Sequence, residues 1–179
     1  MRIIAGTLGG RIFSSPPSHR THPMSDKMRG AIFNSLGDIE GLSVLDAFAG
    51  SGALGFEAIS RGAKYATAIE VDKAAAETIK KNAASLGISG SIKAIRASLS
   101  SWLETSPQEQ LFDIVLADPP YDDVRPALLA QLSEKAKPGG TILFSLPPKA
   151  IVELPPSVYR LLSAKNYGDS QLVFYRRTL

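Results

Sequence analysis

The sequence Asp46-Ala47-Phe48-Ala49-Gly50-Ser51-Gly52-Ala53-Leu54-Gly55 follows a predicted buried strand, Ser43–Asp46, and runs into a predicted helix, Leu54–Arg61. Gly50, Gly52 and Gly55 allow the backbone to turn tightly and to approach a ligand closely at the N-terminus of the helix. A strand, a glycine-rich loop and a helix in this order form the first unit of nucleotide-binding α/β folds. We therefore predict an α/β domain whose ligand lies at this loop.

The same alternation of strand and helix continues along the chain. Further strands are predicted at Tyr65–Val71, Ser91–Ile95, Phe112–Asp118 and Thr141–Leu146, and further helices at Lys73–Leu86, Leu99–Glu104 and Arg125–Lys135. The helix that starts at Lys73 has Asp72 as a predicted N-cap and Gly87 just past its end. Such alternation indicates a parallel sheet that is covered by helices on both faces.

The two ends of the chain follow another pattern. Near the C-terminus, strands Tyr159–Ala164 and Leu172–Arg176 are too close for a crossover helix, so they must form an antiparallel hairpin. Near the N-terminus, short strands at Arg2–Ala5 and Arg11–Ser14 precede a helix that Ser25 caps and Gly37 ends. We predict a Rossmann-like, mostly parallel seven-stranded sheet over residues 38–179. Residues 1–37 would form a hairpin and helix that bind the substrate.

The ligand at the glycine loop has two interpretations. Read as G-x-G-x-x-G, the loop matches the dinucleotide fingerprint, and Glu70 stands 20 residues after Gly50. The glycines therefore leave NAD and S-adenosylmethionine (SAM) both open. Asp46 favours SAM, because a carboxylate there would repel a pyrophosphate but attract the amino group of a methionine moiety. Glu70 suits either ligand, since its carboxylate accepts hydrogen bonds from ribose hydroxyls.

The tetrad Asp118-Pro119-Pro120-Tyr121 ends the predicted strand 112–118. The two prolines have no backbone N–H to donate, and the residue before a proline is held in extended geometry. Oxygen acceptors and an aromatic ring at a strand end suit a planar amino group, which donates two hydrogen bonds and stacks on the ring. The tetrad resembles the catalytic motif of SAM-dependent methyltransferases that modify amino nitrogens of bases or of glutamine side chains, and it has no evident role in hydride transfer.

The composition excludes several kinds of site. The chain has no cysteine, which rules out disulfides, thiolate metal sites and thiol nucleophiles. Its two histidines, His19 and His22, are expected in an exposed loop, and no metal is predicted. The opening residues hold too short an apolar run for a signal peptide, and no stretch is long enough to span a membrane. We therefore expect a cytoplasmic protein.

The positive charge is concentrated near the N-terminus. The whole chain carries a formal net charge of +3, yet five basic residues stand against Asp26 alone in residues 1–30, namely Arg2, Arg11, Arg20, Lys27 and Arg29. A basic segment on a near-neutral body is typical of polyanion binding. A solvated basic surface is an equal alternative on charge alone.

Several segments, spread along nearly the whole chain, resemble the sequences of one known protein family. They are Arg2-Ile-Ile-Ala-Gly6 with Gly10-Arg11, Ser25-Asp26 with Arg29 and Ala31-Ile-Phe-Asn34, Leu45–Gly55 with Glu57-Ala58 and Ser60–Ala63, Asp118–Tyr121, and Asn166-Tyr167-Gly168. In these segments the chain resembles the small bacterial 16S rRNA guanine-N2 methyltransferases, the RsmD-like family. The long glycine-loop run is the specific part, because DNA amino-methyltransferases also have the tetrad.

The resemblance implies a SAM-dependent methyltransferase that modifies the exocyclic N2 of a guanine in 16S rRNA, with the small ribosomal subunit or its assembly intermediate as partner. We expect a monomer. The implied catalytic residues are Asp118, Pro119, Pro120 and Tyr121. The implied cofactor residues are Asp46, Phe48, Ala49, Gly50, Ser51, Gly52, Ala53, Gly55, Glu70, Val71 and Ser98. The implied RNA-binding residues are Arg2, Arg11, Arg20, Ser25 and Arg29.

The chain departs from the family pattern at His22, Met24, Gly30 and Ser98, which puts the target nucleotide and the adenine pocket in question. Three other functions remain open. A DNA adenine or cytosine amino-methyltransferase would share the tetrad but would need a target-recognition domain. A protein glutamine methyltransferase would want asparagine at position 118 and a peptide groove. A non-catalytic nucleic-acid-binding module would need the basic segment but neither Asp46 nor Asp118.

Overall fold

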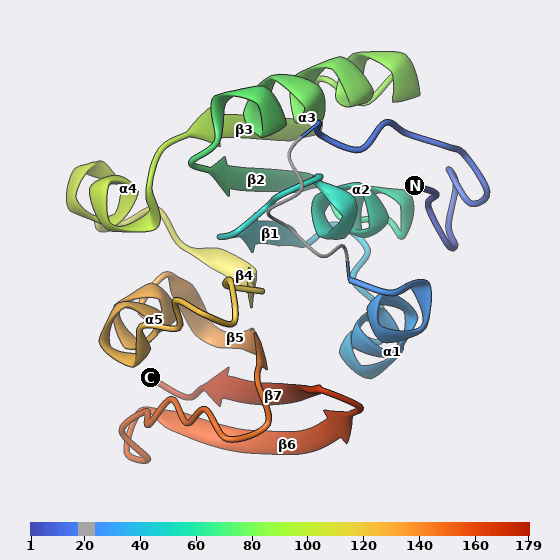
Figure 1. The fold of residues 1–179 in the computed structure, drawn as a ribbon. Helices are drawn as coiled ribbons and strands as arrows, with labels where there is room; N and C mark the ends of the chain where they lie inside the picture. Colours follow the sequence, from blue (N-terminus) through green and yellow to red (C-terminus); the bar gives the residue numbers. More distant parts are fainter. Residues whose placement is uncertain (18–23) are drawn as a thin grey trace.

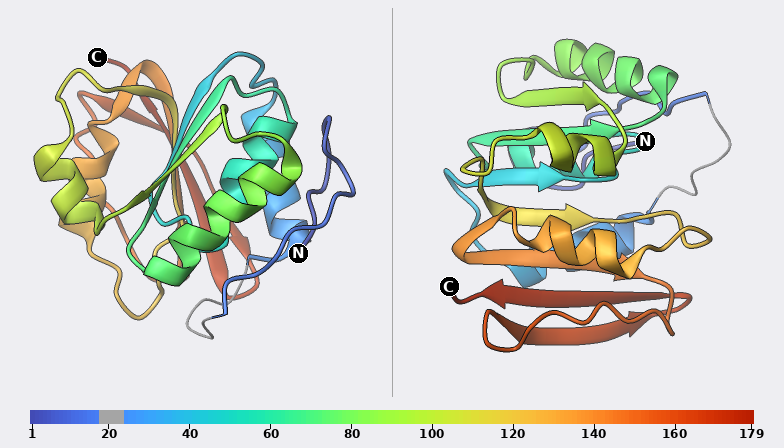
Figure 2. Two further views of the ribbon diagram at one scale, coloured as in Figure 1. Left: turned by 90° about the horizontal axis from the view of Figure 1, so that it is seen from above. Right: turned by 90° about the vertical axis from the view of Figure 1, so that its left-hand side faces the viewer.

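The computed structural model describes residues 1–17 and 24–179, in which seven strands form one sheet with helices on both faces (Figures 1 and 2). The strands are β1 (Ser43–Asp46), β2 (Tyr65–Glu70), β3 (Ile92–Arg96), β4 (Phe112–Ala117), β5 (Ala136–Leu146), β6 (Tyr159–Tyr167) and β7 (Ser170–Arg177). The helices are α1 (Asp26–Leu36), α2 (Ala53–Ser60), α3 (Lys73–Leu86), α4 (Leu99–Thr105) and α5 (Pro126–Ser133).

The strand order is β3-β2-β1-β4-β5-β7-β6, so the order reverses between β1 and β4. The first five strands pair in parallel, whereas β7 pairs antiparallel with both β5 and β6. This confirms the predicted mostly parallel seven-stranded sheet with an antiparallel C-terminal hairpin. In such a sheet ligands bind beyond the carboxyl ends of the strands at the point of reversal. Here that point lies between Asp46 and the residues after β4.

Two apolar cores lie on opposite faces of the sheet. One is formed with α1, α2 and α3, and it includes Phe33, Phe56 and Ile79. The other is formed with α4 and α5, and it includes Trp102 and Leu132. Figure 2 shows α1, α2 and α3 on one side of the sheet and α4 and α5 on the other. Burial on both faces explains why the central strands are almost wholly apolar in sequence.

The ends of the chain differ from the prediction in extent. The predicted N-terminal hairpin is present but shorter than expected: in the described residues a single antiparallel bridge joins Arg2 to Ile12, and backbone hydrogen bonds run from Ile3 to the Arg11 carbonyl and from Phe13 to the Met1 carbonyl. The segment between Arg2 and Ile12 turns at Gly6 and Gly10, both with positive φ, which leaves too little extended backbone for a ladder. At the other end the hairpin is longer than predicted. Its strands continue to Tyr167 and Ser170, and Gly168 (φ 63°) begins a two-residue turn.

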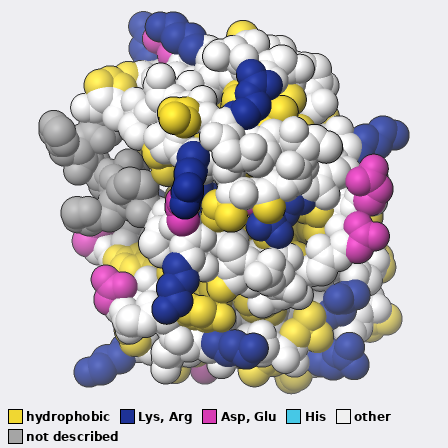
Figure 3. Space-filling view, turned by 90° about the vertical axis from the view of Figure 1, so that its right-hand side faces the viewer, with side chains coloured by type: hydrophobic (Ala, Val, Ile, Leu, Met, Phe, Trp, Pro, Cys, Tyr) yellow, Lys and Arg dark blue, Asp and Glu magenta, His cyan; other side chains and the backbone are white. Residues whose placement is uncertain are grey.

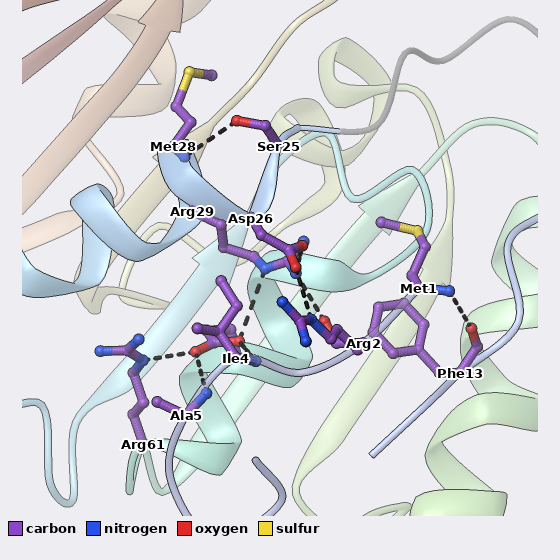
Figure 4. A network of polar contacts seen from close by, with 11 residues as sticks. Met1, Arg2, Ile4, Ala5, Phe13, Ser25, Asp26, Met28, Arg29 and Arg61 are labelled. Carbon is purple, nitrogen blue, oxygen red and sulfur yellow. Dashed lines mark hydrogen bonds and ion pairs between the residues drawn. The ribbon is translucent and has the colours of Figure 1, made fainter. Parts of the chain in front are cut away.

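The N-terminal segment is held against α2 by the carboxylate of Glu57, which is fully buried. Figure 4 labels the residues that this carboxylate contacts, Ile4, Ala5, Arg29 and Arg61. The carboxylate oxygens accept hydrogen bonds from the backbone N–H groups of Ile4 (2.8 Å) and Ala5 (3.1 Å) and from Nε of Arg61 (2.7 Å). Nε of Arg29 lies 3.8 Å away. Ile3 and Phe13 belong to the same core as α2. The predicted division of the chain at residue 37, with residues 1–37 as a substrate-binding part, stays a prediction.

We expect Glu57→Ala to lower the free energy of unfolding by about 3–5 kcal/mol, because it removes the buried countercharge of Arg29, whose closer partner Asp26 is half-exposed. The backbone N–H groups of Ile4 and Ala5 would also lose their acceptor. Glu77→Ala is the matched control, since Glu77 makes only a half-exposed 4.0 Å ion pair with Lys73 and should cost under about 0.5 kcal/mol. Urea denaturation of both variants measures the difference. Equal midpoints would contradict a structural role for Glu57.

Candidate active site

Three carboxylates stand at the carboxyl ends of adjacent strands. Asp46 is the last residue of β1, Glu70 is the last residue of β2, and Asp118 directly follows β4. Because β2, β1 and β4 are neighbours in the sheet, these acids share one edge at the point where strand order reverses. No ion pair within the described residues neutralises any of the three. The edge therefore favours a positively charged ligand.

Asp46 is the most buried of the three. Its relative exposure is 0 %, and neither carboxylate oxygen has a hydrogen-bond partner in the described part of the chain. Burial above all, together with the negative charges of Asp118 and Glu70, raises the pKa of Asp46 to about 7, and the Gly55 and Phe48 backbone N–H groups oppose this rise. A buried acceptor without a donor is costly unless a ligand supplies one. Asp46 thus fits the ammonium group of an amino-acid moiety.

Glu70 has a second role that the sequence did not reveal. Its two oxygens accept hydrogen bonds from the backbone N–H groups of Gly50 and Asp72, each at 2.7 Å. Partial burial raises the pKa of the Glu70 carboxyl. These bonds fasten the glycine loop to the end of β2. Each oxygen keeps a free lone pair, so Glu70 can still accept from a ribose hydroxyl.

The glycine loop has the backbone geometry that its sequence predicted. Gly50 (φ 52°) and Gly52 (φ 81°) lie in the left-handed region, and Gly52 is the N-cap of α2 without a side-chain cap. A Cβ at Gly55 would lie 2.9 Å from Cδ1 of Ile92. The third glycine therefore favours close packing of α2 on β3, because a side chain here would displace the end of the Ile92 side chain. The other predicted loop residues, Phe48, Ala49, Ser51 and Ala53, lie in or next to this turn.

The predicted adenine-side residues lie at the next strand ends. Val71 directly follows β2 and is 65 % exposed, which leaves an apolar surface beside Glu70. Ser98 is the N-cap of α4, and its Oγ accepts from the backbone N–H of Ser101 at 3.2 Å. The backbone N–H of Ala97 donates to the Glu70 carbonyl at 3.1 Å, so the two segments adjoin. Their contact with a cofactor stays a prediction.

The Asp118–Tyr121 tetrad connects to two serines that the sequence analysis missed. The Tyr121 hydroxyl donates to Oγ of Ser170 at 2.7 Å and lies 3.2 Å from Oγ of Ser145. Both serines are buried, whereas the tyrosine is half-exposed. Burial raises the pKa of Asp118 to about 6, and a hydrogen bond from Ser145 opposes that rise. A hydroxyl in the otherwise apolar run Ile142–Leu146 was the available signal for Ser145.

The predicted RNA-binding residues have mixed outcomes. Arg29 is wrong as a phosphate ligand, because it is fully buried and its Nη2 donates to the Arg2 carbonyl (2.7 Å) and to Asp26 (2.9 Å). Ser25 caps α1, with its Oγ accepting from the Met28 N–H at 3.2 Å. Exposed Arg11 donates to the Leu86 and Ser85 carbonyls at the end of α3, each at 3.1 Å.

Of the remaining basic residues of the segment, Arg2 is paired, Arg20 is undescribed, and Lys27 is exposed without an ion pair in the described residues. Arg2 forms a 2.9 Å ion pair with Asp26, although its side chain is largely exposed. Arg20, His19 and His22 lie outside the described residues. Across residues 1–17 and 24–179, no group of three or more His, Asp or Glu side chains could hold a metal ion. No helix in those same ranges is long and apolar enough to cross a membrane.

Comparison with known proteins agrees with this geometry. The family model described as "Conserved hypothetical protein 95" matches residues 1–176. The chain is 40% identical over 123 residues to ribosomal RNA small subunit methyltransferase D of Haemophilus influenzae, covering 68% of this chain and only 64% of that protein. It is 31% identical over 184 residues to the putative rRNA methyltransferase YlbH of Bacillus subtilis, covering 99% of each. Its structure matches that of the putative methyltransferase yhhF of Escherichia coli with a TM-score of 0.86 and 31% identity, covering 99% of this chain and 98% of that one.

Proposed function

This chain belongs to the Conserved hypothetical protein 95 family, that of the RsmD-like rRNA methyltransferases, and we propose that it methylates the N2 amino group of a guanine in 16S rRNA. The observation that carries the proposal is the buried, partnerless Asp46 carboxylate beside Asp118 and Glu70 at the point of strand reversal. This arrangement supports a cationic cofactor and an amino-group acceptor that meet at one edge of the sheet.

The residues present fit S-adenosyl-L-methionine as the cofactor. When bound, SAM supplies an electrophilic methyl group on a positively charged sulfur. Asp46 would accept from the ammonium group of its methionine part, and the free lone pairs of Glu70 would accept from ribose hydroxyls. Gly50 and Gly52, both with positive φ, allow the backbone of the loop to turn tightly and to come close to the ligand. The exposed side chain of Val71 offers an apolar contact for the adenine.

Asp118 would orient the target nitrogen. The amino group of guanine is a poor nucleophile because its lone pair is delocalised into the ring. A carboxylate and the Pro119 carbonyl, accepting one N–H each, would favour a more pyramidal and electron-rich nitrogen. With a pKa of about 6, Asp118 is mostly ionised at pH 7 and accepts strongly. The amino proton becomes acidic only as the new bond forms, so positioning supplies much of the acceleration.

Tyr121 would stack on the base, since the residue is 38 % exposed while its hydroxyl is held by Ser170 and Ser145. We expect Tyr121→Phe to raise KM several-fold with a small change in kcat, because the ring stays but loses its anchor. Tyr121→Ala should raise KM further, because the stacking surface is lost, which is worth about 1–3 kcal/mol per base. Ser170→Ala is the matched control for the anchor and should behave like Tyr121→Phe. Steady-state kinetics measure these effects. A KM that is unchanged in both Tyr121→Phe and Tyr121→Ala would contradict this role of Tyr121.

The test of the proposed function is transfer of a tritiated methyl group from SAM to three substrates in parallel. These are naked 16S rRNA, free small ribosomal subunits and duplex DNA. We expect label in an RNA substrate, recovered as N2-methylguanosine after digestion. Label in the duplex DNA alone would instead favour a DNA adenine or cytosine amino-methyltransferase. The guanine assignment would be overturned if the protein binds SAM but labels none of the three substrates. It would also be overturned if the labelled RNA contains no N2-methylguanosine.

A further inference from the structure

Two arginines stand side by side on the C-terminal hairpin. Arg160 of β6 and Arg176 of β7 are direct cross-strand partners, and both are exposed. Neither makes an ion pair or a side-chain hydrogen bond with any residue of the described ranges. Like charges directly opposite each other destabilise a pair of strands. An anion bound across both side chains would remove that cost.

A third cation lies on the same face of the hairpin. Lys165 is exposed and stands opposite Leu172. Directly opposed residues point to the same side of a sheet, and alternate residues along β7 do so too, which places Lys165 with Arg160 and Arg176. On this side of the molecule Lys and Arg side chains outnumber Asp and Glu (Figure 3). The surface is therefore positive.

A shallow groove runs beside these cations. It lies between the C-terminal end of α1 and the hairpin, and its lining consists of Ser35, Leu36, Thr141, Leu162, Ser163, Phe174 and Arg176. Hydroxyl groups and an arginine can donate hydrogen bonds to phosphate or sugar oxygens. Leu162 adds an exposed apolar surface. The groove thus combines hydroxyl groups and Arg176, which can bind a sugar–phosphate chain, with the apolar side chains of Leu36, Leu162 and Phe174.

The hairpin is joined to the candidate active site by a hydrogen bond. Ser170, the first residue of β7, accepts from the Tyr121 hydroxyl at 2.7 Å. At about 3.3 Å per strand residue, the row of Lys165 lies about 7 Å from Ser170 along β7, and Arg176 lies about 20 Å from it. The cations therefore form a track that leads away from the site where the target base would stack.

We propose that this face of the β6–β7 hairpin, with Lys165, Arg160 and Arg176, binds the backbone phosphates of the RNA strand next to the target base. The inference rests on the proposed rRNA methyltransferase function and adds a docking surface to it. Phosphate contacts of this kind fix the register of the RNA without reading its sequence. The contact with Tyr121 means that RNA held on the hairpin is positioned relative to the tetrad.

The test compares Arg160→Gln/Arg176→Gln with Lys64→Gln/Lys93→Gln, a control that removes the same charge. Lys64 and Lys93 are exposed and unpaired within the described residues, and Lys93 lies in β3 at the opposite edge of the sheet. Binding of a fluorescent 16S rRNA fragment is measured by anisotropy between about 50 and 300 mM salt. The arginine variant should bind about tenfold or more weakly near 100 mM, with a salt slope reduced by about 1.4, since each single-strand phosphate contact contributes about 0.7.

The control should bind like the wild type, and Arg160→Lys/Arg176→Lys should restore most of the affinity. SAM binding should be the same in all variants. Equal losses in the arginine variant and the control, or no loss in either, would overturn the hairpin surface while rRNA methylation by the wild type stands. A wild-type protein that binds or methylates no rRNA would instead refute the proposed function. The two failures are thereby separable.

Discussion

Asp118→Ala should reduce the rate of methyl transfer by about 100-fold or more, the range seen when one pre-organised hydrogen-bonding group is removed from a reacting centre. The loss should fall mainly on kcat, because the contact strengthens as the nitrogen becomes more acidic during transfer. Asp118→Asn keeps an acceptor of the same size but without charge. It should therefore lose less, about tenfold, since charge-assisted hydrogen bonds are roughly twice as strong as neutral ones.

Cofactor affinity provides the control for this result. The negative charge of Asp118 is one cause of the raised pKa of Asp46, so its removal lets Asp46 ionise at lower pH. Both variants should still bind SAM, as measured by calorimetry, because Asp46 and Glu70 are unchanged. In the wild type, kcat should fall as pH drops through about 6, where Asp118 takes up a proton. A folded, SAM-bound Asp118→Ala enzyme that works at the wild-type rate would show that Asp118 has no part in the reaction.

Asp46→Asn should have opposite effects on stability and on cofactor binding. The folded-state pKa of Asp46 is raised to about 7, against about 3.9 in an unfolded chain. The folded state thus holds a proton that the unfolded state has lost between about pH 4 and 7. Stability therefore decreases as pH rises through this window, by up to about 4 kcal/mol. Asparagine removes this cost, so the ligand-free variant should be the more stable protein at pH 8.

The same substitution should weaken SAM binding by about 10- to 100-fold, because a hydrogen bond to a charged group is worth about 1.5–3 kcal/mol. SAM should then raise the melting temperature of the wild type much more than that of the variant. Wild-type affinity should also fall below about pH 7, with a proton released on binding, because the ammonium group of the ligand favours the ionised carboxylate. Calorimetry in buffers of different ionisation enthalpy measures that proton. Tight pH-independent binding by Asp46→Asn would contradict the assignment.

Local sequence patterns were enough to predict the main helices and strands. They were also enough to predict most of the sheet edge at which the cofactor is proposed to bind. β1 and α3 have the predicted ends, and the other strands of the parallel sheet differ by a few residues at their termini. The largest difference is β5, which begins at Ala136 rather than Thr141, where Phe112 pairs with Ala136 before a register shift. Such irregular pairing depends on the neighbouring strand, so no pattern in the strand itself reveals it.

By itself the sequence determined which elements form and that three acids follow strands at one edge, because apolar periodicity, caps and glycine conformations act over a few residues. Tertiary structure decided what each polar side chain contacts. Arg29 was predicted as an RNA ligand from its charge, but it is buried against Asp26 and Glu57, which lies 28 positions away. Tyr121 is anchored by Ser170, 49 positions away. The cost of burying a charge or a hydroxyl depends on partners that only folding brings together, so these roles are set by the packed structure.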